Sequence, residues 1–463
     1  MAPAVVVRDL FLRALGAIAL IAFGSLQGQA RLLFGSDGLA PACAATARST
    51  AAWWQEPSLF AWQCSDRWLE LGALAGMLAS VLLIFHVLPR LCLLAIWLLY
   101  LSFVTVGSPF LDFQWDNLLL ETCFFSWWIA PWRGGSAVPP SAPALFLMRW
   151  LLFRLHFESG IAKLASGDPT WRDLTAMVSY YETAPLPTWI GWYAHQMPEW
   201  LHRLSSAATF AVELLVPFLF WGPFALRRAA FVLAIGFHLF VLLTANYTIF
   251  NYLSIALCLF LLAPIWPERG NHSGGRSALA RWAGRAGAVI LIGLSTLPFL
   301  GMLGQAPRLA LPLMQQLAPL RTFNAYHLFA SMTLIRREAV VEGSDDGLTW
   351  SAYELHYKPG DPLRPPRFVA PHQPRVDFQM WFLLLGRRGA PYFDRLLFAL
   401  LERPQTVAPL FAHNPFPDRP PKMLRVAIYR YQFSRRDERE TTGAWWVRNL
   451  ESYSRTLTHP DTR

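Results

Sequence analysis

The run Leu91-Cys-Leu-Leu-Ala-Ile-Trp-Leu-Leu-Tyr-Leu-Ser-Phe-Val-Thr-Val-Gly107 is apolar along its whole length and contains no charged side chain. A helix that crosses the hydrocarbon core of a bilayer needs about 17–25 mostly apolar residues. Comparable runs occur before and after it, at about 10–28, 68–88, 113–131, 142–160, 204–222, 229–247, 248–265 and 283–303. The sequence therefore predicts an α-helical polytopic membrane domain of about nine spans.

The overall composition is that of a membrane protein. The 463 residues are 54% hydrophobic and 15% charged, whereas about 25% of the residues in soluble domains are charged. This balance excludes a disordered, collagen-like or ordinary cytosolic chain. The apolar runs end near residue 310 and charged residues then become more frequent. We therefore predict a transmembrane domain at 1–310, with external loops at 29–67 and 161–203, and a soluble C-terminal domain at 322–463.

The net charge of +10 comes almost entirely from arginine. The sequence has no basic run with interleaved aromatic residues, so we expect no nucleic-acid partner. Many arginines flank the apolar runs instead, and the cytoplasmic loops of membrane proteins are enriched in such residues. With a cytoplasmic N-terminus, the inward side carries Arg8, Arg90, Arg133, Arg227, Arg228, Arg269, Arg276 and Arg281. An odd number of spans then predicts that the C-terminal domain lies outside the cytoplasm.

Two of the five cysteines, Cys43 and Cys64, lie in the first predicted external loop. Extracytoplasmic compartments permit disulfides, so these two residues are candidates for a bridge, with two free thiols as the alternative. The other three cysteines fall within predicted spans, where a small buried thiol is expected. The cysteine spacing matches no zinc or thioredoxin-type motif, and we predict neither a metal site nor a cofactor.

Several charged residues fall inside the predicted spans, where charge is costly and is usually either paired or functional. Arg149, His156 and Lys163 are spaced seven residues apart, so they share one helical stripe. One interpretation is a structural network of ion pairs, formed by Asp116, Glu121, Arg149, Arg154, Glu158 and Lys163. The other is a polar pocket in which Lys163 acts as a base, with His156 and Glu158 as further catalytic candidates. Glu213, His238, Asn246 and Asn251 are interpreted as lone polar groups that hydrogen-bond between helices.

The second predicted external loop contains a motif of polar and aromatic residues. Its members are Asp168, Trp171, Arg172, Asp173, Tyr181 and Glu182. Glycine and proline mark turns on both sides of this motif. We predict that Asp173 caps a short helix, because an aspartate side chain accepts hydrogen bonds from the first turn.

The region after residue 322 predicts a small α+β or β-sandwich-like domain. Residues 338–357 predict two strands joined at Asp345-Asp346-Gly347, because glycine tolerates the positive φ of a hairpin turn. A further strand is expected at 424–433, and helices at 378–385, 392–401 and 406–411. Two proline-rich loops interrupt these elements and predict a rigid protein-binding surface. The candidates for binding a client protein are His372, Arg375, Asp377, Asn414, Asp418 and Arg419.

Together these segments resemble the lipase maturation factor family. The motifs that carry the resemblance are Gly35-Ser-Asp-Gly38-Leu-Ala-Pro41, Phe113-Gln-Trp-Asp116-Asn-Leu-Leu-Leu-Glu121, Gly160-Ile-Ala-Lys163-Leu-Ala-Ser-Gly-Asp168-Pro-Thr-Trp171, Tyr181-Glu182-Thr-Ala-Pro-Leu-Pro187, Asn246-Tyr-Thr-Ile-Phe-Asn251, Glu342-Gly-Ser-Asp-Asp-Gly-Leu-Thr-Trp350, Val369-Ala-Pro-His-Gln-Pro-Arg375 and Asn414-Pro-Phe-Pro-Asp-Arg-Pro-Pro421. The resemblance implies an integral multi-pass membrane protein that assists folding and assembly of secreted lipases. It also implies that the C-terminal domain engages the client on the lumenal side of the endoplasmic reticulum membrane. The abundance of Arg, Ala and Pro suggests a bacterial genome, in which case the equivalent is the periplasmic side of the inner membrane.

A second resemblance covers only the stretch Ser159-Gly-Ile-Ala-Lys163-Leu before Trp171. It is similar to the segment that carries the catalytic lysine of vitamin K-dependent γ-carboxylase. This resemblance implies an alternative function, a membrane enzyme that uses Lys163 as a base on a quinol or lipid-like ligand. We favour the non-enzymatic assembly factor, and we rank a transporter last because the sequence shows no inverted repeat.

Overall fold

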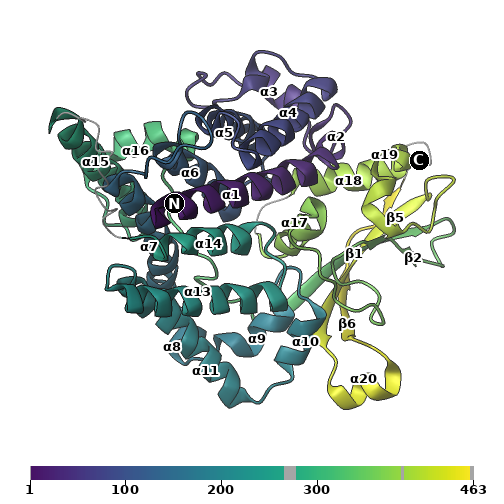
Figure 1. The fold of residues 1–463 in the computed structure, drawn as a ribbon. Helices are drawn as coiled ribbons and strands as arrows, with labels where there is room; N and C mark the ends of the chain where they lie inside the picture. Colours follow the sequence, from purple (N-terminus) through teal and green to yellow (C-terminus); the bar gives the residue numbers. More distant parts are fainter. Residues whose placement is uncertain (1, 265–277, 387–389, 459–463) are drawn as a thin grey trace.

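The computed structural model describes residues 2–264, 278–386 and 390–458 (Figure 1). Arg269 and Arg276, which were assigned to the inward side, lie outside these residues. Each predicted apolar run coincides with helical structure. The corresponding helices are α1 (Pro3–Gln27), α4 (Asp66–Ile84), α5 (Pro89–Val106), α6 (Gln114–Ile129), α7 (Ala142–Ala165), α11 (Glu199–Phe210) with α12 (Val216–Leu219), α13 (Phe224–Thr244), α14 (Phe250–Cys258) and α15 (Ala278–Met302).

Four helical segments are long and apolar enough to cross a membrane, among the residues that the structure describes. They are α4, α5, α13 and the part of α15 at Trp282–Met302. Helices α6 and α14 are shorter than a span, with 16 and 9 residues, and α7 carries four charged side chains. The prediction of nine spans is therefore not confirmed, although a helical region with several apolar helices is.

The helical region is packed around α1, which lies against α4 and α14 (Figure 1). Close approach between α1 and α4 depends on two glycines. A Cβ at Gly76 would lie 2.3 Å from the Phe23 ring, and one at Gly16 would lie 2.9 Å from the Ile84 side chain. Because these distances are too short for any real side chain, the two helices could not pack this tightly with larger residues.

Short helices connect these longer ones. They are α2 (Ala30–Phe34), α3 (Ala42–Arg48), α8 (Pro169–Arg172), α9 (Ala176–Thr183), α10 (Trp189–His195) and α16 (Leu311–Leu317). A π-helical turn, η2 (Ala211–Leu215), lies between α11 and α12. Short 3-10 turns occur at η1 (Leu59–Ala61), η3 (Leu259–Leu261), η4 (Arg308–Ala310), η5 (Ala318–Leu320) and η6 (Ala408–Leu410).

The C-terminal region forms a five-stranded antiparallel sheet in the order β2-β1-β5-β6, in which β7 also pairs with β5. Its strands are β1 (Arg336–Ser344), β2 (Ser351–Ala352), β5 (Met423–Phe433), β6 (Trp446–Tyr453) and β7 (Leu457–Thr458). A separate two-stranded pair joins β3 (Glu354–Leu355) to β4 (Phe411–His413). The helices of this region are α17 (Arg375–Leu383), α18 (Pro391–Glu402), α19 (Pro404–Val407) and α20 (Arg436–Thr442). Because α17 lies against β1 and α18 against β5, the arrangement is α+β rather than a sandwich of two sheets.

The predicted hairpin turn is present between β1 and β2. Gly347 has a φ of +73°, and the Asp346 carboxylate accepts hydrogen bonds from the Thr349 and Leu348 amides, which lower the pKa of Asp346 to about 2. The second strand is shorter than predicted, because the chain leaves this sheet after Ala352 and pairs with β4 instead. The predicted helix at 406–411 is also wrong at its end, since Phe411 begins β4.

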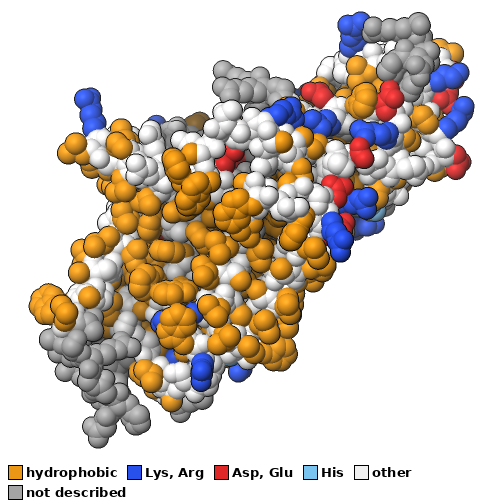
Figure 2. Space-filling view, turned by 90° about the horizontal axis from the view of Figure 1, so that it is seen from above, with side chains coloured by type: hydrophobic (Ala, Val, Ile, Leu, Met, Phe, Trp, Pro, Cys, Tyr) orange, Lys and Arg blue, Asp and Glu red, His pale blue; other side chains and the backbone are white. Residues whose placement is uncertain are grey.

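The surface divides into two parts (Figure 2). On the face seen in Figure 2, apolar side chains cover most of the helical region, whereas Lys, Arg, Asp and Glu side chains gather on the end formed by the C-terminal region. An apolar surface of this extent is expected where helices face lipid.

Candidate functional site

Arg375, the first residue of α17, enters the helical region and pairs with Asp116 of α6. Its Nη2 and Nη1 atoms lie 3.0 and 3.1 Å from the two Asp116 carboxylate oxygens. The Tyr100 hydroxyl of α5 also donates to Asp116, at 2.5 Å. Arg375 is only 2% exposed, so it is not available on the surface as the predicted client-binding residue. Asp116 thus obtains its cation from the C-terminal region and not from the fifth predicted span.

The residues next to Arg375 are also held by the helical region. The Trp115 indole donates to the Gln373 side-chain oxygen at 2.9 Å, and His372 Nδ1 lies 2.9 Å from the Ser25 hydroxyl of α1. Asp377 is buried and accepts hydrogen bonds from the amides of Tyr357 and Lys358. His372 and Arg375 therefore contact the helical region, whereas Asp377 is buried within the C-terminal region. These contacts are the physical reason why the three residues do not form a free surface.

Asn246, between α13 and α14, holds another part of the C-terminal region. Its amide nitrogen donates to the carbonyl oxygens of Leu186 and Arg367, at 3.0 and 2.9 Å. Its amide oxygen accepts from the amides of Val369 and Ala370, at 2.8 and 2.9 Å. All of the hydrogen-bonding capacity of the Asn246 side chain is used in holding Leu186 and the segment 367–370 beside the start of α14.

The second external loop lies against the C-terminal sheet. Glu182 accepts a hydrogen bond from the Phe433 amide at 3.0 Å, and burial raises the pKa of its carboxyl group. Arg336 of β1 is buried and donates to the carbonyl oxygens of Glu182, Ala184 and Pro185. This region of the loop is therefore part of the interface.

The other residues of the external-loop motif are partly buried against neighbouring segments and partly exposed. Asp168, and not Asp173, caps α8 by accepting from the Thr170 amide at 2.8 Å, and its other oxygen accepts from the Met332 amide. The Trp171 indole donates to the Phe329 carbonyl at 2.9 Å. Tyr181 is buried, whereas Arg172 and Asp173 are exposed.

The second proline-rich loop, by contrast, is on the surface. Asp418 and Arg419 are exposed, and Arg419 pairs with Asp345 at 2.6 Å. Asn414 is partly exposed and accepts from the Phe416 amide. A role for Asn414, Asp418 and Arg419 in binding a client stays a prediction.

The charged residues of α7 reach three different groups of partners. Arg154 pairs with Glu121 and lies 3.7 Å from Glu158, whose carboxylate also accepts from the Tyr326 amide. Arg149 instead donates to the carbonyl oxygens of Phe260, Ala263 and Pro264, at the end of the α14 segment. A cation is favourable there, because the carbonyl groups at a helix C-terminus carry partial negative charge. Lys163 pairs with Glu213, which was not a member of the predicted network.

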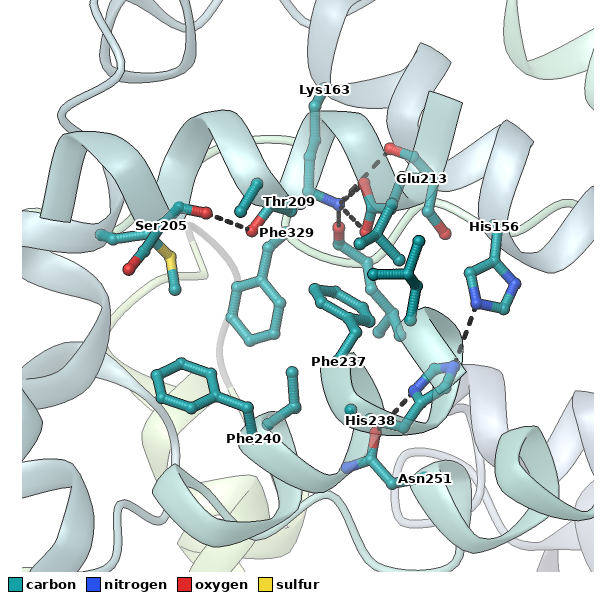
Figure 3. Close-up of a pocket in the computed structure, with 18 of the residues that line it drawn as sticks. His156, Lys163, Ser205, Thr209, Glu213, Phe237, His238, Phe240, Asn251 and Phe329 are labelled. Atoms are coloured by element: carbon teal, nitrogen blue, oxygen red, sulfur yellow. Dashed lines mark hydrogen bonds and ion pairs between the residues drawn. The ribbon is translucent and has the colours of Figure 1, made fainter. Parts of the chain in front are cut away.

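Lys163 and Glu213 lie on the wall of a cavity of about 440 Å³ (Figure 3). The lysine Nζ is 2.9 Å from Glu213 Oε1, 2.9 Å from the Leu328 carbonyl and 3.4 Å from the Ser159 carbonyl. It also lies 5.3 Å from the centre of the Trp171 ring. Because an ammonium group has three N–H donors, each donor of Lys163 has an acceptor. Glu213 belongs to the π-helical turn η2, a feature found frequently at functional sites.

A chain of hydrogen bonds forms another wall of the cavity (Figure 3). His156 Nδ1 lies 3.0 Å from the Leu152 carbonyl oxygen, and His156 Nε2 lies 3.2 Å from His238 Nε2. His238 Nδ1 lies 3.2 Å from the Asn251 amide oxygen. The carbonyl can only accept, so His156 carries its proton on Nδ1. The Asn251 amide oxygen can likewise only accept, so His238 also carries a proton on Nδ1.

Glu213, His238 and Asn251 were interpreted from the sequence as separate polar groups, but the structure brings them to the same cavity. One signal could have identified Glu213, since a buried Lys163 requires an acidic partner. No pattern in the sequence indicated that His238 faces His156.

Cys43 and Cys64 form a disulfide between α3 and the start of α4. Cys92, Cys123 and Cys258 are buried thiols. Among the described residues, no group of three His, Cys, Asp or Glu side chains is placed to hold a metal ion.

Comparison with known proteins places the whole chain in one family. The lipase maturation factor transmembrane domain matches residues 6–265, and the lipase maturation factor C-terminal domain matches residues 322–455. Lipase maturation factor 2 of Homo sapiens is 33% identical over 575 aligned residues, which cover 95% of this chain and 81% of the relative. Lipase maturation factor 1 of Bos taurus is 31% identical, over 98% of this chain and 90% of the relative.

No solved structure matches the chain. The names of the relatives give no support to the γ-carboxylase-like alternative. Their identity over nearly the full length, together with both domain matches, shows that this chain belongs to the lipase maturation factor family.

Proposed function

We propose that this protein is a membrane-anchored maturation factor that assists folding and assembly of secreted lipases or related exported proteins. It acts as a folding factor and not as an enzyme. The observation that carries this proposal is the buried attachment of the C-terminal region to the helices through Arg375 and Asn246. This attachment holds the charged surface of the C-terminal region at a fixed place beside the apolar helices (Figure 2).

The chain is divided into two domains that this attachment joins. Residues 1–310 form the membrane domain, in which the four apolar helices and the remaining predicted runs make up nine membrane-embedded segments. Residues 322–463 form the C-terminal domain, and the lipid bilayer is the partner of the apolar surface. Support comes from the exposed apolar side chains on α4, α5, α13 and α15.

The sidedness of the protein is supported by the two ends of α1. Near its start, Arg8 donates to the carbonyl oxygens of Ser136 and Val138, in the Arg-containing loop before α7. Near its end, Ser25 contacts His372 of the C-terminal domain. Since arginine-rich ends face the cytoplasm, the C-terminal domain lies in the lumen of the endoplasmic reticulum in a eukaryote, or in the periplasm in a bacterium.

The client surface is the exposed proline-rich loop that contains Asn414, Asp418 and Arg419. Proline fixes the backbone of this loop, so a partner meets a surface that loses little conformational entropy on binding. Asp418 and Arg419 are exposed and are not among the residues that Arg375 and Asn246 contact.

Co-expression with a secreted lipase tests the proposal. We expect the full chain to raise the lipase activity recovered per molecule of lipase, and a chain that ends at residue 330 to give no increase. An Asp418→Ala, Arg419→Ala double variant should reach the wild-type level in the membrane but support less lipase activity. Undiminished support by the chain that ends at residue 330 would contradict the proposal.

A further inference from the structure

The cavity beside Lys163 opens toward the lipid-facing side of α13. Val232 and Leu233 of α13 line the cavity and are 66% and 48% exposed. Ala208 of α11 lines it from the other side and is also exposed. Helix α13 is one of the four apolar helices, and only 22% of its apolar stretch is buried. The opening between α11 and α13 therefore faces the hydrocarbon of a bilayer.

Gly236 marks this opening. It lines the cavity and is exposed, and a Cβ built on it would meet no atom within 4 Å. Glycine inside a helix is less favourable than alanine. No close packing at Gly236 compensates for this cost, whereas Gly16 and Gly76 are needed for helix contact. Its absent side chain leaves the cavity open.

The interior of the cavity is mostly apolar and large enough for a small ligand. Phe237, Phe240 and Phe329 project into the space between the helices (Figure 3). A volume of about 440 Å³ lies within the range of roughly 300–1,000 Å³ that is usual for small-molecule sites. The same volume would hold about 15 water molecules at liquid density. An apolar wall gives such waters few partners, so hydrocarbon is the better occupant beside a bilayer.

The polar groups of the cavity decide the charge of the ligand. The positive charge of Lys163 is balanced by Glu213 at 2.8 Å, so an additional buried charge would have no counter-ion. Asn251 is 1% exposed, and its amide nitrogen, a donor, has no hydrogen-bond partner among the described residues. A neutral group with hydroxyl or ester oxygens satisfies that atom without adding charge.

We propose that this cavity binds a neutral acyl lipid from the surrounding bilayer, with its chain between Phe237, Phe240 and Phe329 and its polar group toward Lys163, Glu213 and Asn251. The lipid is bound without chemical change. The proposal goes beyond lipase maturation and does not depend on it, because it is argued from the shape, lining and position of the cavity alone.

Photolabelling of the full-length protein tests the proposal. The probe is a monoacylglycerol with a diazirine in its acyl chain, present in phosphatidylcholine vesicles that contain the protein. We expect labelling of residues around the opening, on α11 and α13. Gly236→Leu should fill the opening and reduce the labelled product by about tenfold. Ala208→Leu, from the opposite side of the opening, should reduce it in the same direction.

Gly293→Leu is the matched control. Gly293 is also an exposed helical glycine with no atom within 4 Å of a built Cβ, but it lies on α15 and does not line the cavity. We expect this variant to be labelled like the wild type. Equal labelling of the wild type and both opening variants, at equal abundance in the vesicles, would overturn the proposal. Stronger specific labelling by the matching fatty acid probe would overturn the assignment of a neutral ligand.

Discussion

The ion pair that joins the C-terminal domain to the helical region differs in kind from one on the surface of the C-terminal domain. The side chains of Arg375 and Asp116 are 3% and 0% exposed, whereas those of Arg419 and Asp345 are 70% and 31% exposed. Breaking a buried pair leaves an uncompensated charge that water cannot solvate. Breaking an exposed pair costs little, because water replaces the partner. The same residue types therefore hold the two domains together in one place and stay accessible to a partner in the other.

The largest effect is expected for Arg375→Ala, which leaves Asp116 buried without a cation. Loss of one partner from a buried pair costs about 3–5 kcal/mol, so we expect a lower melting temperature and faster proteolysis between the two domains. Thermal unfolding and limited proteolysis of the purified full-length protein measure both effects. The double variant Arg375→Met, Asp116→Leu should regain most of the lost stability. An Arg375→Ala protein as stable as the wild type would contradict a buried attachment.

Lys163→Ala is expected to have the next largest effect. It should lower the free energy of unfolding by roughly 3 kcal/mol, because Glu213 is then buried without a cation. The abundance of the protein in membranes should fall together with its thermal stability. The matched comparison is Lys163→Met with Glu213→Leu, which removes both charges and should restore abundance. If Lys163→Ala abolished support of lipase activity while abundance and stability stayed at the wild-type level, the role of the Lys163–Glu213 pair would not be purely structural.

Cys43→Ser with Cys64→Ser should have an intermediate effect. A disulfide that closes a loop of this size, with a sequence separation of 21, contributes about 3 kcal/mol by constraining the unfolded chain. The first external loop should become sensitive to protease, while the attachment through Arg375 persists. Proteolytic mapping of the oxidised and variant proteins checks this expectation. Unchanged protease sensitivity of the loop would show that packing alone maintains its structure.

The smallest effect on stability is expected for Arg419→Ala, at about 0–1 kcal/mol. Its pair with Asp345 is exposed, so thermal unfolding should be nearly unchanged. Support of lipase activity should nevertheless decrease if this loop contacts the client. A large loss of stability would remove the distinction between the two kinds of ion pair.

Sequence alone could locate the helices and the charged residues inside them, because both are local patterns. It also located the hairpin at Gly347. It could not pair Asp116 with Arg375, which are 259 positions apart, since no local pattern links two such residues. The two proline-rich loops look alike in sequence, and only the fold shows that one is buried and the other exposed.

The count of nine spans treated each apolar run as equivalent, whereas four helical segments among the described residues are long and apolar enough to cross a membrane. Helix α14 has only 9 residues, and α7 carries charges that need partners from α6, η2 and the C-terminal domain. The cavity could not be predicted either, because it depends on which helices leave a space beside Gly236. Its residues were each visible in the sequence, but their common location was not.

The most direct test of the account places a photo-crosslinking amino acid at position 418 or at position 232 of the full-length protein, co-expressed with a secreted lipase. Position 418 lies on the exposed loop of the C-terminal domain, and position 232 on the lipid-facing side of α13. The account predicts a lipase adduct from position 418 and none from position 232. Adducts from position 232 alone, or from neither position while lipase activity is still supported, would contradict it.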